Sequence, residues 1–160
     1  MRQVTLVYCL KGDSVLFGMK KRGFGAEKLN GYGGKVEDGE TIEDAAVREL
    51  YEEAEIKAVP SDLEKVAVID FYFNDAPEDK NWNQTVNVYL LKKWNGEPKE
   101  TEEMRPEWHS RSSLPMQKMW IDDQYWLPDV LAGKKMRASF TFGNQGASII
   151  GHEIKYSESL

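Results

Sequence analysis

Apolar residues along the chain fall into short runs of strand length that are separated by turns and polar loops. Such runs are typical of β-strands that are covered on one or both faces. The runs come in pairs, so each pair predicts a hairpin. They cover residues 4–10 and 14–19, residues 66–73 and 85–94, and residues 134–142 and 147–156. The middle pair is joined by a long polar loop over residues 74–84.

A helix is predicted over residues 41–54. Ile42, Ala46 and Leu50 recur at helical spacing and form one stripe that would pack against a sheet. Thr41, followed three residues later by an aspartate, is a plausible capping box at the start of this helix.

A second helix is predicted to begin at Asp122 or Asp123 and to run toward Leu131, with an irregularity at Pro128. Residues 94–106 are polar and charged and predict a loop. Strands outnumber helices, and the pattern indicates one α+β domain over residues 1–160, in which a mixed sheet carries a helix on each face.

Composition excludes several classes of protein. The chain of 160 residues has one cysteine and two histidines, which argues against a disulfide framework and a cysteine- or histidine-rich metal site. No apolar run approaches the ~18 residues that a membrane span needs. A net charge of −6 argues against binding to nucleic-acid polymers. We therefore expect a cytoplasmic protein with neither a membrane nor a nucleic-acid partner.

The acidic excess is confined to one segment. Residues 34–56 contain nine of the 27 acidic residues but only two of the 21 basic ones, so the remainder of the chain is close to neutral. The acidity is therefore a property of the predicted helix and of the loop before it.

Three glutamates of this helix share one face. Glu49, Glu52 and Glu53 stand at positions i, i+3 and i+4, which places their Cβ atoms roughly 5–6 Å apart. Arg48 can pair with Glu52 or with a carboxylate of the preceding loop, but one arginine cannot neutralise three carboxylates. Oxygen ligands in this arrangement suit Mg²⁺ or Mn²⁺. The alternative is an ordinary solvated acidic face.

The segment before the helix favours the metal interpretation. Residues 22–34 contain five glycines, and exposed backbone groups of such a loop can cradle phosphate or offer a carbonyl oxygen to a metal. Lys20 and its two basic neighbours precede the loop, as an anionic substrate would require. Ordinary surface charge is the alternative for this basic run.

The residues from Gly34 onward resemble the signature of the Nudix family, which is a glycine, five residues, a glutamate, seven residues and then Arg-Glu-aliphatic-any-Glu-Glu-any-Gly-aliphatic. Here Gly34 and Glu40 are followed by Arg-Glu-Leu-Tyr-Glu-Glu-Ala-Glu-Ile from Arg48 onward. The last glycine alone differs, being Glu55, and this substitution concerns the end of the helix. The resemblance implies the Nudix fold, a three-layer α/β/α sandwich around a mixed β-sheet.

The resemblance extends beyond the signature to the Nudix hydrolases that act on oxidised purine nucleoside triphosphates. It is carried by residues 18–26, 30–36, 103–106 and 119–126. It implies Mg²⁺-dependent hydrolysis of 8-oxo-dGTP and 2-hydroxy-dATP to a nucleoside monophosphate and pyrophosphate, with Mn²⁺ as a possible substitute. It also implies a small-molecule nucleotide as the partner of a monomer.

The resemblance also implies roles for individual residues. The implied metal ligands are the carbonyl of Gly33 and the carboxylates of Glu49, Glu52, Glu53 and Glu103. The implied catalytic residues are Glu53 or Glu52 as the base, together with Arg48. The implied substrate-binding residues are Thr5, Lys20, Phe24, Asn30, Gly34, Lys35, Phe71, Trp120, Asp122 and Asp123, with Trp126 as a further pocket wall.

In this scheme Asp122 and Asp123 read the purine edge, Trp120 stacks on the base and Asn30 is a second polar reader. Two adjacent carboxyl groups in an aromatic pocket do not both ionise easily, so a shared proton would let the pair accept either an oxo-guanine or a hydroxy-adenine edge. The alternative is that the aspartates only cap a helix and that Trp120 belongs to the core.

The sequence departs from the oxidised-purine hydrolases that it resembles at three places that flank the expected base pocket, namely Leu29, Ile121 and the longer loop over residues 74–84. The ranking of substrates is therefore open. The chain can also be a Nudix hydrolase of another nucleotide, such as a methylated purine triphosphate or a dinucleoside polyphosphate. A third reading is a non-catalytic nucleotide-binding module. Such a module is expected to lose carboxylates of the signature, and none is lost here.

Overall fold

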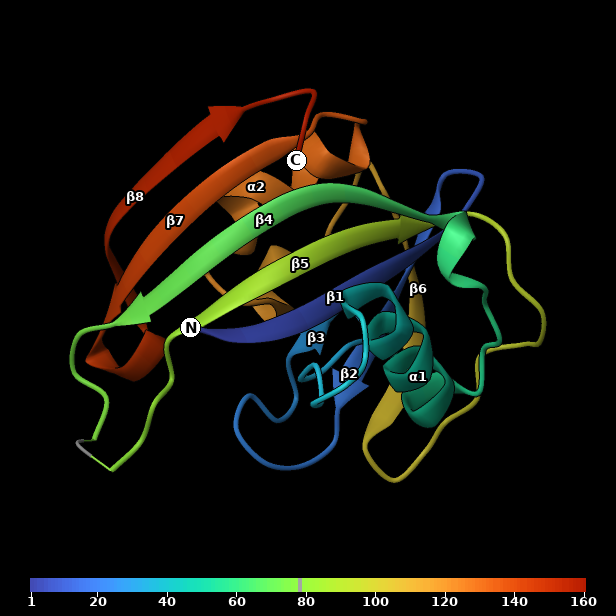
Figure 1. Ribbon diagram of the computed structural model, residues 1–160, viewed down its shortest axis with the longest axis horizontal. Coiled ribbons are helices and arrows are strands. Elements are labelled where there is room, and N and C mark those ends of the chain that lie inside the picture. The colour runs from blue at the N-terminus through green and yellow to red at the C-terminus, as the bar shows by residue number, and fades with distance from the viewer. Residues whose placement is uncertain (78) are drawn as a thin grey trace.

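The computed structural model describes residues 1–77 and 79–160 and, within them, one mixed sheet of eight strands. The strands run in the order β3-β2-β1-β5-β4-β7-β8, and β6 pairs with the other edge of β2. β1 is parallel to β5 and β4 is parallel to β7, while the other pairs are antiparallel (Figure 1). The strands are β1 Arg2–Lys11, β2 Ser14–Lys20, β3 Leu29–Asn30, β4 Leu63–Phe73, β5 Gln84–Leu91, β6 Met104–Ser110, β7 Met136–Gly143 and β8 Ser148–Tyr156.

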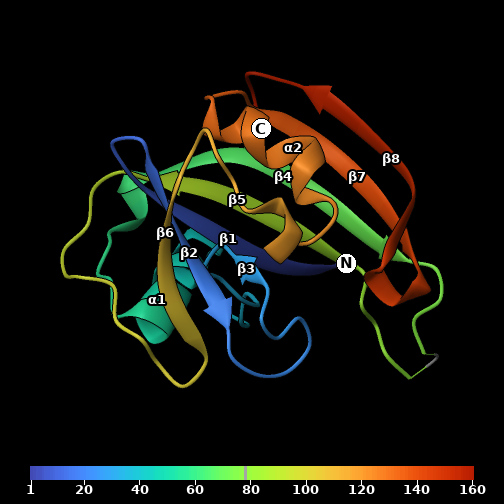
Figure 2. The same cartoon turned by 180° about the vertical axis from the view of Figure 1, so that it is seen from behind.

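Helices cover the two faces of the sheet. α1 (Ile42–Ala54) packs on one face and α2 (Asp123–Leu131) on the other, as the opposite views in Figures 1 and 2 show. Side chains of β1 alternate accordingly, because Val7 belongs to the core beneath α1 whereas Tyr8 belongs to the core beneath α2. The predicted α+β class, with a mixed sheet between helices, is confirmed. Short 3₁₀ turns complete the connections at Pro60–Asp62, Met116–Lys118 and Asn144–Gly146.

The predicted first helix forms with the predicted cap. The hydroxyl oxygen of Thr41 accepts a hydrogen bond from the amide of Asp44 at 3.0 Å. At the other end Glu55 adopts the left-handed conformation (φ 55°) and its amide donates to the carbonyl of Tyr51 at 2.8 Å. The helix therefore ends as it would with the signature glycine, although a non-glycine residue in this conformation costs on the order of 1 kcal/mol.

The prediction of a loop over residues 94–106 is wrong at its end, because β6 begins at Met104. This strand lies at an edge of the sheet and is largely exposed, so it lacks the apolar alternation that marks a half-buried strand. Its proline, Pro106, stands opposite Gly18 and is tolerated because an edge strand does not need every amide for pairing. β3, a two-residue strand inside the glycine loop, was also not predicted. The other predicted ends differ from the observed ones by at most three residues.

Within residues 1–77 and 79–160, no helix combines the length and the apolar composition that crossing a membrane requires.

Candidate active site

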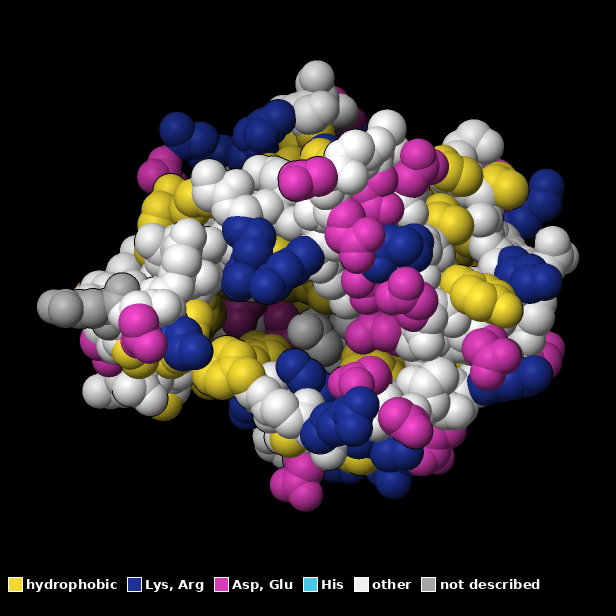
Figure 3. All heavy atoms as spheres, turned by 60° about the horizontal axis from the view of Figure 1, so that its bottom comes forward, with side chains coloured by type: hydrophobic (Ala, Val, Ile, Leu, Met, Phe, Trp, Pro, Cys, Tyr) yellow, Lys and Arg dark blue, Asp and Glu magenta, His cyan; other side chains and the backbone are white. Residues whose placement is uncertain are grey.

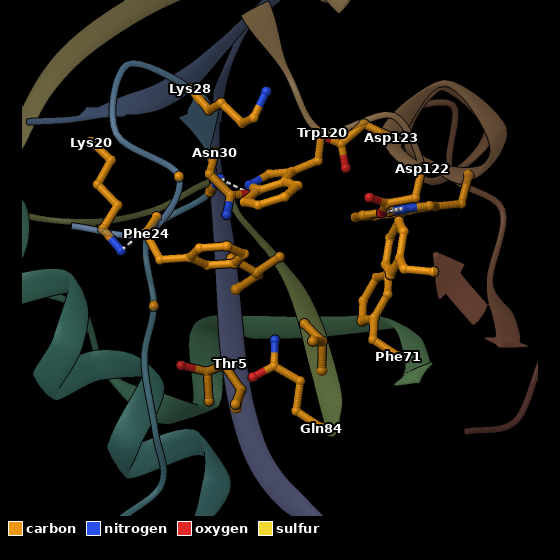
Figure 4. Close-up of a pocket in the computed structure, with 18 of the residues that line it drawn as sticks. Thr5, Lys20, Phe24, Lys28, Asn30, Phe71, Gln84, Trp120, Asp122 and Asp123 are labelled. Carbon is orange, nitrogen blue, oxygen red and sulfur yellow. Dashed lines mark hydrogen bonds between the residues drawn. The ribbon is translucent and has the colours of Figure 1, made fainter. Parts of the chain in front are cut away.

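A pocket of about 310 Å³ opens between the glycine loop, the strands next to β1 and the start of α2. In the space-filling view it is a hollow with acidic side chains in its depth and a band of further acidic side chains beside it (Figure 3). Most of the predicted site residues converge on this hollow (Figure 4). Those that line it are Thr5, Lys20, Phe24, Asn30, Gly33, Glu53, Phe71, Trp120, Asp122, Asp123 and Trp126.

Arg48 is the centre of the acidic band beside the pocket. Its guanidinium donates to the carboxylate of Glu40 at 2.7 Å and to that of Glu49 at 2.9 Å, and it lies 3.3 Å from Glu52. It also donates to the carbonyl of Lys35 at 3.1 Å. Arg48 thus pairs both within the helix and with the preceding loop, and the sequence had left these as alternatives. The hydrogen bonds that Arg48 donates to Glu40 and Glu49 hold its pKa well above the usual value.

Glu53 is the acidic residue that reaches the pocket. Its carboxylate accepts a hydrogen bond from the amide of Gly33 at 2.9 Å. Burial raises the pKa of Glu53 to about 8, and the charges of Glu49 and Glu103 add to the rise, while the Gly33 amide and Lys20 oppose it. The pKa of Glu49 is raised too, again mainly by burial. The site therefore holds more negative charge than its lysine and arginines compensate.

Two glycines let the loop approach both the sheet and the helix. A Cβ atom at Gly33 would lie 1.7 Å from the carbonyl oxygen of Thr5, and one at Gly34 would lie 2.5 Å from the carboxyl carbon of Glu49. The amide of Thr5 donates to the carbonyl of Gly34 at 2.9 Å. Glycine is required at these positions because no side chain fits between β1, the loop and α1.

The basic run before the loop is divided between two tasks. Lys20 lines the pocket, and its ammonium donates to the carbonyl of Phe24 at 2.7 Å. Lys21 instead pairs with Glu100 at 2.6 Å, and the guanidinium Nε of Arg22 donates to Glu103 at 3.0 Å. The ion pair with Arg22 lowers the pKa of Glu103. Of the three basic residues, Lys20 is the one placed to meet an anionic substrate.

The donor set near Glu53 fits a hard divalent cation. Its side chains offer carboxylate oxygens, and the buried carboxyl of Glu53 has an excess of negative neighbours that a cation would offset. In the described ranges, 1–77 and 79–160, no three acidic, histidine or cysteine side chains converge closely enough to hold an ion by themselves. Arg48 and Arg22 instead hold Glu49 and Glu103, so a cation would compete with these arginines for the two carboxylates.

The end of the pocket at the start of α2, where the sequence predicts base binding and which we call the base end, contains two buried carboxyl groups. Asp122 and Asp123 are 4% and 2% exposed. Asp122 accepts a hydrogen bond from the indole Nε1 of Trp126 at 2.8 Å, whereas the Oδ2 atom of Asp123 has no partner in the described part of the chain. Burial raises the pKa of both groups, and hydrogen bonding between them raises the pKa of Asp123 while lowering that of Asp122. The pair is therefore built to share one proton.

The capping alternative does not account for this pair. Asp122 occupies the N-cap position of α2, yet its side chain makes no capping hydrogen bond. Its carboxylate is used by Trp126 instead. The two aspartates thus open the helix, as predicted, with their side chains directed into the pocket rather than onto the helix end (Figure 4).

Aromatic rings border the base end. The ring centroids of Trp120 and Phe24 are 5.3 Å apart, and Phe24 stacks on its other side against Trp82, also at 5.3 Å. The ammonium of Lys28 lies 5.3 Å from the centroid of a Trp120 ring. The side-chain oxygen of Asn30 accepts from the amide of Gly31 at 3.0 Å, which leaves the amide nitrogen of Asn30 directed toward the pocket (Figure 4).

Some residues that line the pocket were not predicted, among them Lys28 and Gln84, and neither was Trp82, which stacks against the pocket residue Phe24. They lie in or next to loops, and no local pattern marks them. Conversely, six predicted residues do not line the pocket. These six are Gly34, Lys35, Arg48, Glu49, Glu52 and Glu103.

Known proteins are similar to this chain over most of its length. A sequence model described as the NUDIX domain matches residues 1–130. The oxidized purine nucleoside triphosphate hydrolase of Mus musculus is 42% identical over 159 residues, which cover 99% of this chain and 97% of that protein. The protein of the same name from Danio rerio is 41% identical and covers 98% of this chain and 96% of its own length.

A solved structure of the MutT protein from Bacillus halodurans superimposes with a TM-score of 0.82. It covers 97% of this chain and 98% of its own at 20% identity, so this likeness concerns the fold.

Proposed function

Since the chain belongs to the Nudix family, we propose that it is a hydrolase of oxidised purine nucleoside triphosphates, which it converts to the nucleoside monophosphate and pyrophosphate. Substrates of this class are 8-oxo-dGTP and 2-hydroxy-dATP, and their removal would sanitise the nucleotide pool.

The observation that carries this proposal is the buried aspartate pair beside Trp120. Asp122 and Asp123 line the same pocket with almost no exposed surface, and each has a pKa raised by burial. A pair that holds one proton offers both a donor and an acceptor, so it can pair with a purine edge that presents an acceptor beside a donor in either order. Trp120 supplies the face on which the base would stack.

The other end of the pocket supports the phosphate chemistry. Lys20 would bind the triphosphate, and Gly33, Glu49, Glu52, Glu53 and Glu103 would hold a divalent cation, Mg²⁺ in our proposal, with Mn²⁺ as a substitute. When bound, that cation would offset the triphosphate charge and lower the pKa of water at the site.

We assign Glu53 as the group that takes the proton from the attacking water. Its carboxyl lines the pocket, and burial raises its pKa in the metal-free protein. A cation bound beside it would offset this rise and keep the carboxylate available as a base near neutral pH. Glu52, the other glutamate predicted for this role, lies on the exposed side of α1. Arg48 would hold Glu49 and Glu40 in place around it.

Four finer predictions from the sequence stay predictions. They are that the chain is one domain and works as a monomer, that it resides in the cytoplasm, and that it binds no nucleic-acid polymer.

The test is a screen for pyrophosphate release in the presence of Mg²⁺ over normal, oxidised and methylated nucleoside triphosphates and dinucleoside polyphosphates. We expect the oxidised purine triphosphates to have the highest kcat/KM. A preference for methylated purines or dinucleoside polyphosphates would replace this substrate assignment, and tight binding without turnover of any nucleotide would overturn the enzymatic role.

A pair of variants tests the assigned chemistry. Glu53→Gln should abolish turnover without loss of folding. Asp44→Asn, which changes an exposed carboxylate in the first turn of the same helix, should leave turnover intact. Retained activity in Glu53→Gln would refute the role of Glu53.

A further inference from the structure

β8 is an edge strand with a free outer side. It pairs with β7, and residues 1–77 and 79–160 contain no strand on its other side. In Figures 1 and 2 it forms the rim of the sheet, and no helix of the described residues lies along that rim. An uncovered edge presents backbone donors and acceptors that can pair with another strand. β8 can therefore extend the sheet.

The pairing of β8 with β7 determines which backbone groups of β8 face outward. The amide of Ser157, just after the strand, donates to the carbonyl of Lys135 at 2.9 Å. Hydrogen-bonded and non-hydrogen-bonded pairs alternate along an antiparallel ladder, so the residues two and four positions before Ser157 also direct their backbone groups to β7. The backbone groups of His152, Ile154 and Tyr156 therefore point away from β7 and are available to a further strand.

The side chains of these three outward-facing residues lie on the α2 side of the sheet. Ile154 packs against the core beneath α2. The ring of His152 stacks on Phe140 at a centroid distance of 5.5 Å. The hydroxyl of Tyr156 donates to Asp129 of α2 at 2.5 Å, although the residue is 57% exposed. Apolar and aromatic side chains thus border the free edge on this side.

Two charged residues of β8 lie on the opposite side of the sheet, because successive side chains of a strand alternate. The carboxylate of Glu153 and the ammonium of Lys155 are 3.4 Å apart, and both side chains are well exposed. Arg137 of β7 stands directly opposite Lys155, and like charges in such a position repel. Two cations therefore share one carboxylate here, and a second carboxylate opposite Lys155 would offset the excess.

A second copy of the chain supplies that carboxylate in one register of antiparallel pairing. A two-fold axis at Ile154 places Glu153 of each copy opposite Lys155 of the other, which gives two ion pairs. A shift by two residues places Glu153 opposite Glu153 in one direction and Lys155 opposite Lys155 in the other. Larger shifts set these charges opposite uncharged residues. Intermediate registers match outward-facing backbone groups with groups that face β7, so they form no ladder.

We propose that β8 pairs antiparallel with β8 of a second copy about a two-fold axis at Ile154, which continues the sheet across both copies. In this register His152 lies opposite Tyr156 of the second copy, so the α2 side contributes aromatic pairs as well. The inference does not rest on the proposed function. The residues that line the pocket lie outside β8, so each copy keeps a whole site and a single copy is still expected to be active.

The charge pattern also sets how selective and how strong the pairing is. A lysine on an edge strand commonly disfavours pairing with other strands. Here the glutamate two residues away makes the same lysine favourable in one register and leaves the neighbouring registers unfavourable. A single strand pair buries less surface than the roughly 1,200 Å² of stable complexes, so we expect a reversible dimer whose population depends on protein concentration.

The test is charge reversal, followed by sedimentation velocity over a series of protein concentrations. The wild type should change from monomer to dimer as its concentration rises. Lys155→Glu and Glu153→Lys each place two pairs of like charges across the axis, so each should raise the Kd of the dimer by roughly tenfold or more. An equimolar mixture of the two variants restores both ion pairs and should associate as the wild type does. Recovery in the mixture separates loss of pairing from loss of folding.

A matched control and a second measurement locate the interface. Lys11→Glu makes the same change of charge at an exposed lysine at the end of β1, and it should leave the Kd of the dimer unchanged. Amide hydrogen exchange of the wild type should slow with rising concentration at His152, Ile154 and Tyr156. The amides between them already face β7 and should not change.

Three results would overturn the proposal. The first is a wild type that stays monomeric at every concentration. The second is a dimer that neither charge reversal weakens, since such a dimer uses another surface. The third is an equimolar mixture of the two variants that fails to associate. Each result leaves the proposed hydrolase function untouched, because that function depends on the pocket.

Discussion

Replacing Glu53 by glutamine should stabilise the protein in the absence of divalent metal while it removes activity. The folded state keeps the carboxyl of Glu53 in a buried position where its pKa rises from 4.5 to about 8. A glutamine can accept the hydrogen bond that Gly33 donates at 2.9 Å, and it carries no charge to desolvate. The variant therefore loses the cost of the charge and keeps the contact.

The size of the effect follows from linkage. The folded pKa of Glu53 lies above the unfolded one, so wild-type stability is lost as the pH rises from about 4.5 to 8 and is flat above that range. The full difference between the folded and unfolded pKa of Glu53 corresponds to roughly 5 kcal/mol in the free energy of unfolding. The new amide group needs its own partners, which costs about 1–3 kcal/mol. We therefore expect the variant to exceed the wild type by about 2–4 kcal/mol at pH 9 and to gain nothing near pH 5.

Urea unfolding followed by tryptophan fluorescence, with EDTA present, measures this difference at each pH. Mg²⁺ added at pH 9 should then stabilise the wild type more than Glu53→Gln, because the carboxylate is one of the proposed ligands. A variant with the same advantage at pH 5 and pH 9 would refute the argument that the buried charge is responsible. A variant less stable than the wild type at pH 9 would do the same.

Three further predictions concern the pocket. Asp122→Asn should change the ranking of purine triphosphates in kcat/KM more than it changes kcat for the preferred one; an unchanged ranking would remove Asp122 from base recognition. Trp82→Ala should raise KM by roughly tenfold, because Phe24 loses its stacking partner and a lost aromatic pair is worth about that factor. An unchanged KM would show that the contact between Trp82 and Phe24 does not contribute to substrate binding. Gly33→Ala should lower the unfolding temperature by several degrees, because its Cβ atom would meet the carbonyl oxygen of Thr5, and wild-type melting would contradict that close approach.

The sequence predicted the features that follow from spacing between neighbouring residues in the chain. It missed the contacts and the strands that form only when distant segments pack together. The shared face of the glutamates follows from helix geometry, and α1 forms where the capping box and the apolar stripe place it. The pairing of Arg22 with Glu103 joins residues far apart in the chain, and no spacing rule anticipates it. β6 was missed for a related reason, since an edge strand carries little apolar pattern and gains its order from pairing with β2.

The segment from Lys20 to Gly33 connects the two ends of the site. Lys20, at the proposed phosphate end, donates to the carbonyl of Phe24, whose ring packs against Trp120 at the proposed base end. Gly33, at the end of the same segment, donates to Glu53. A purine that enters between Trp120 and Phe24 would have to displace or tilt Phe24, because rings 5.3 Å apart leave no room for a third between them. A displacement of Phe24 that includes its backbone would move the carbonyl to which Lys20 donates, and would thereby couple binding of the base to the position of Lys20, the proposed triphosphate contact.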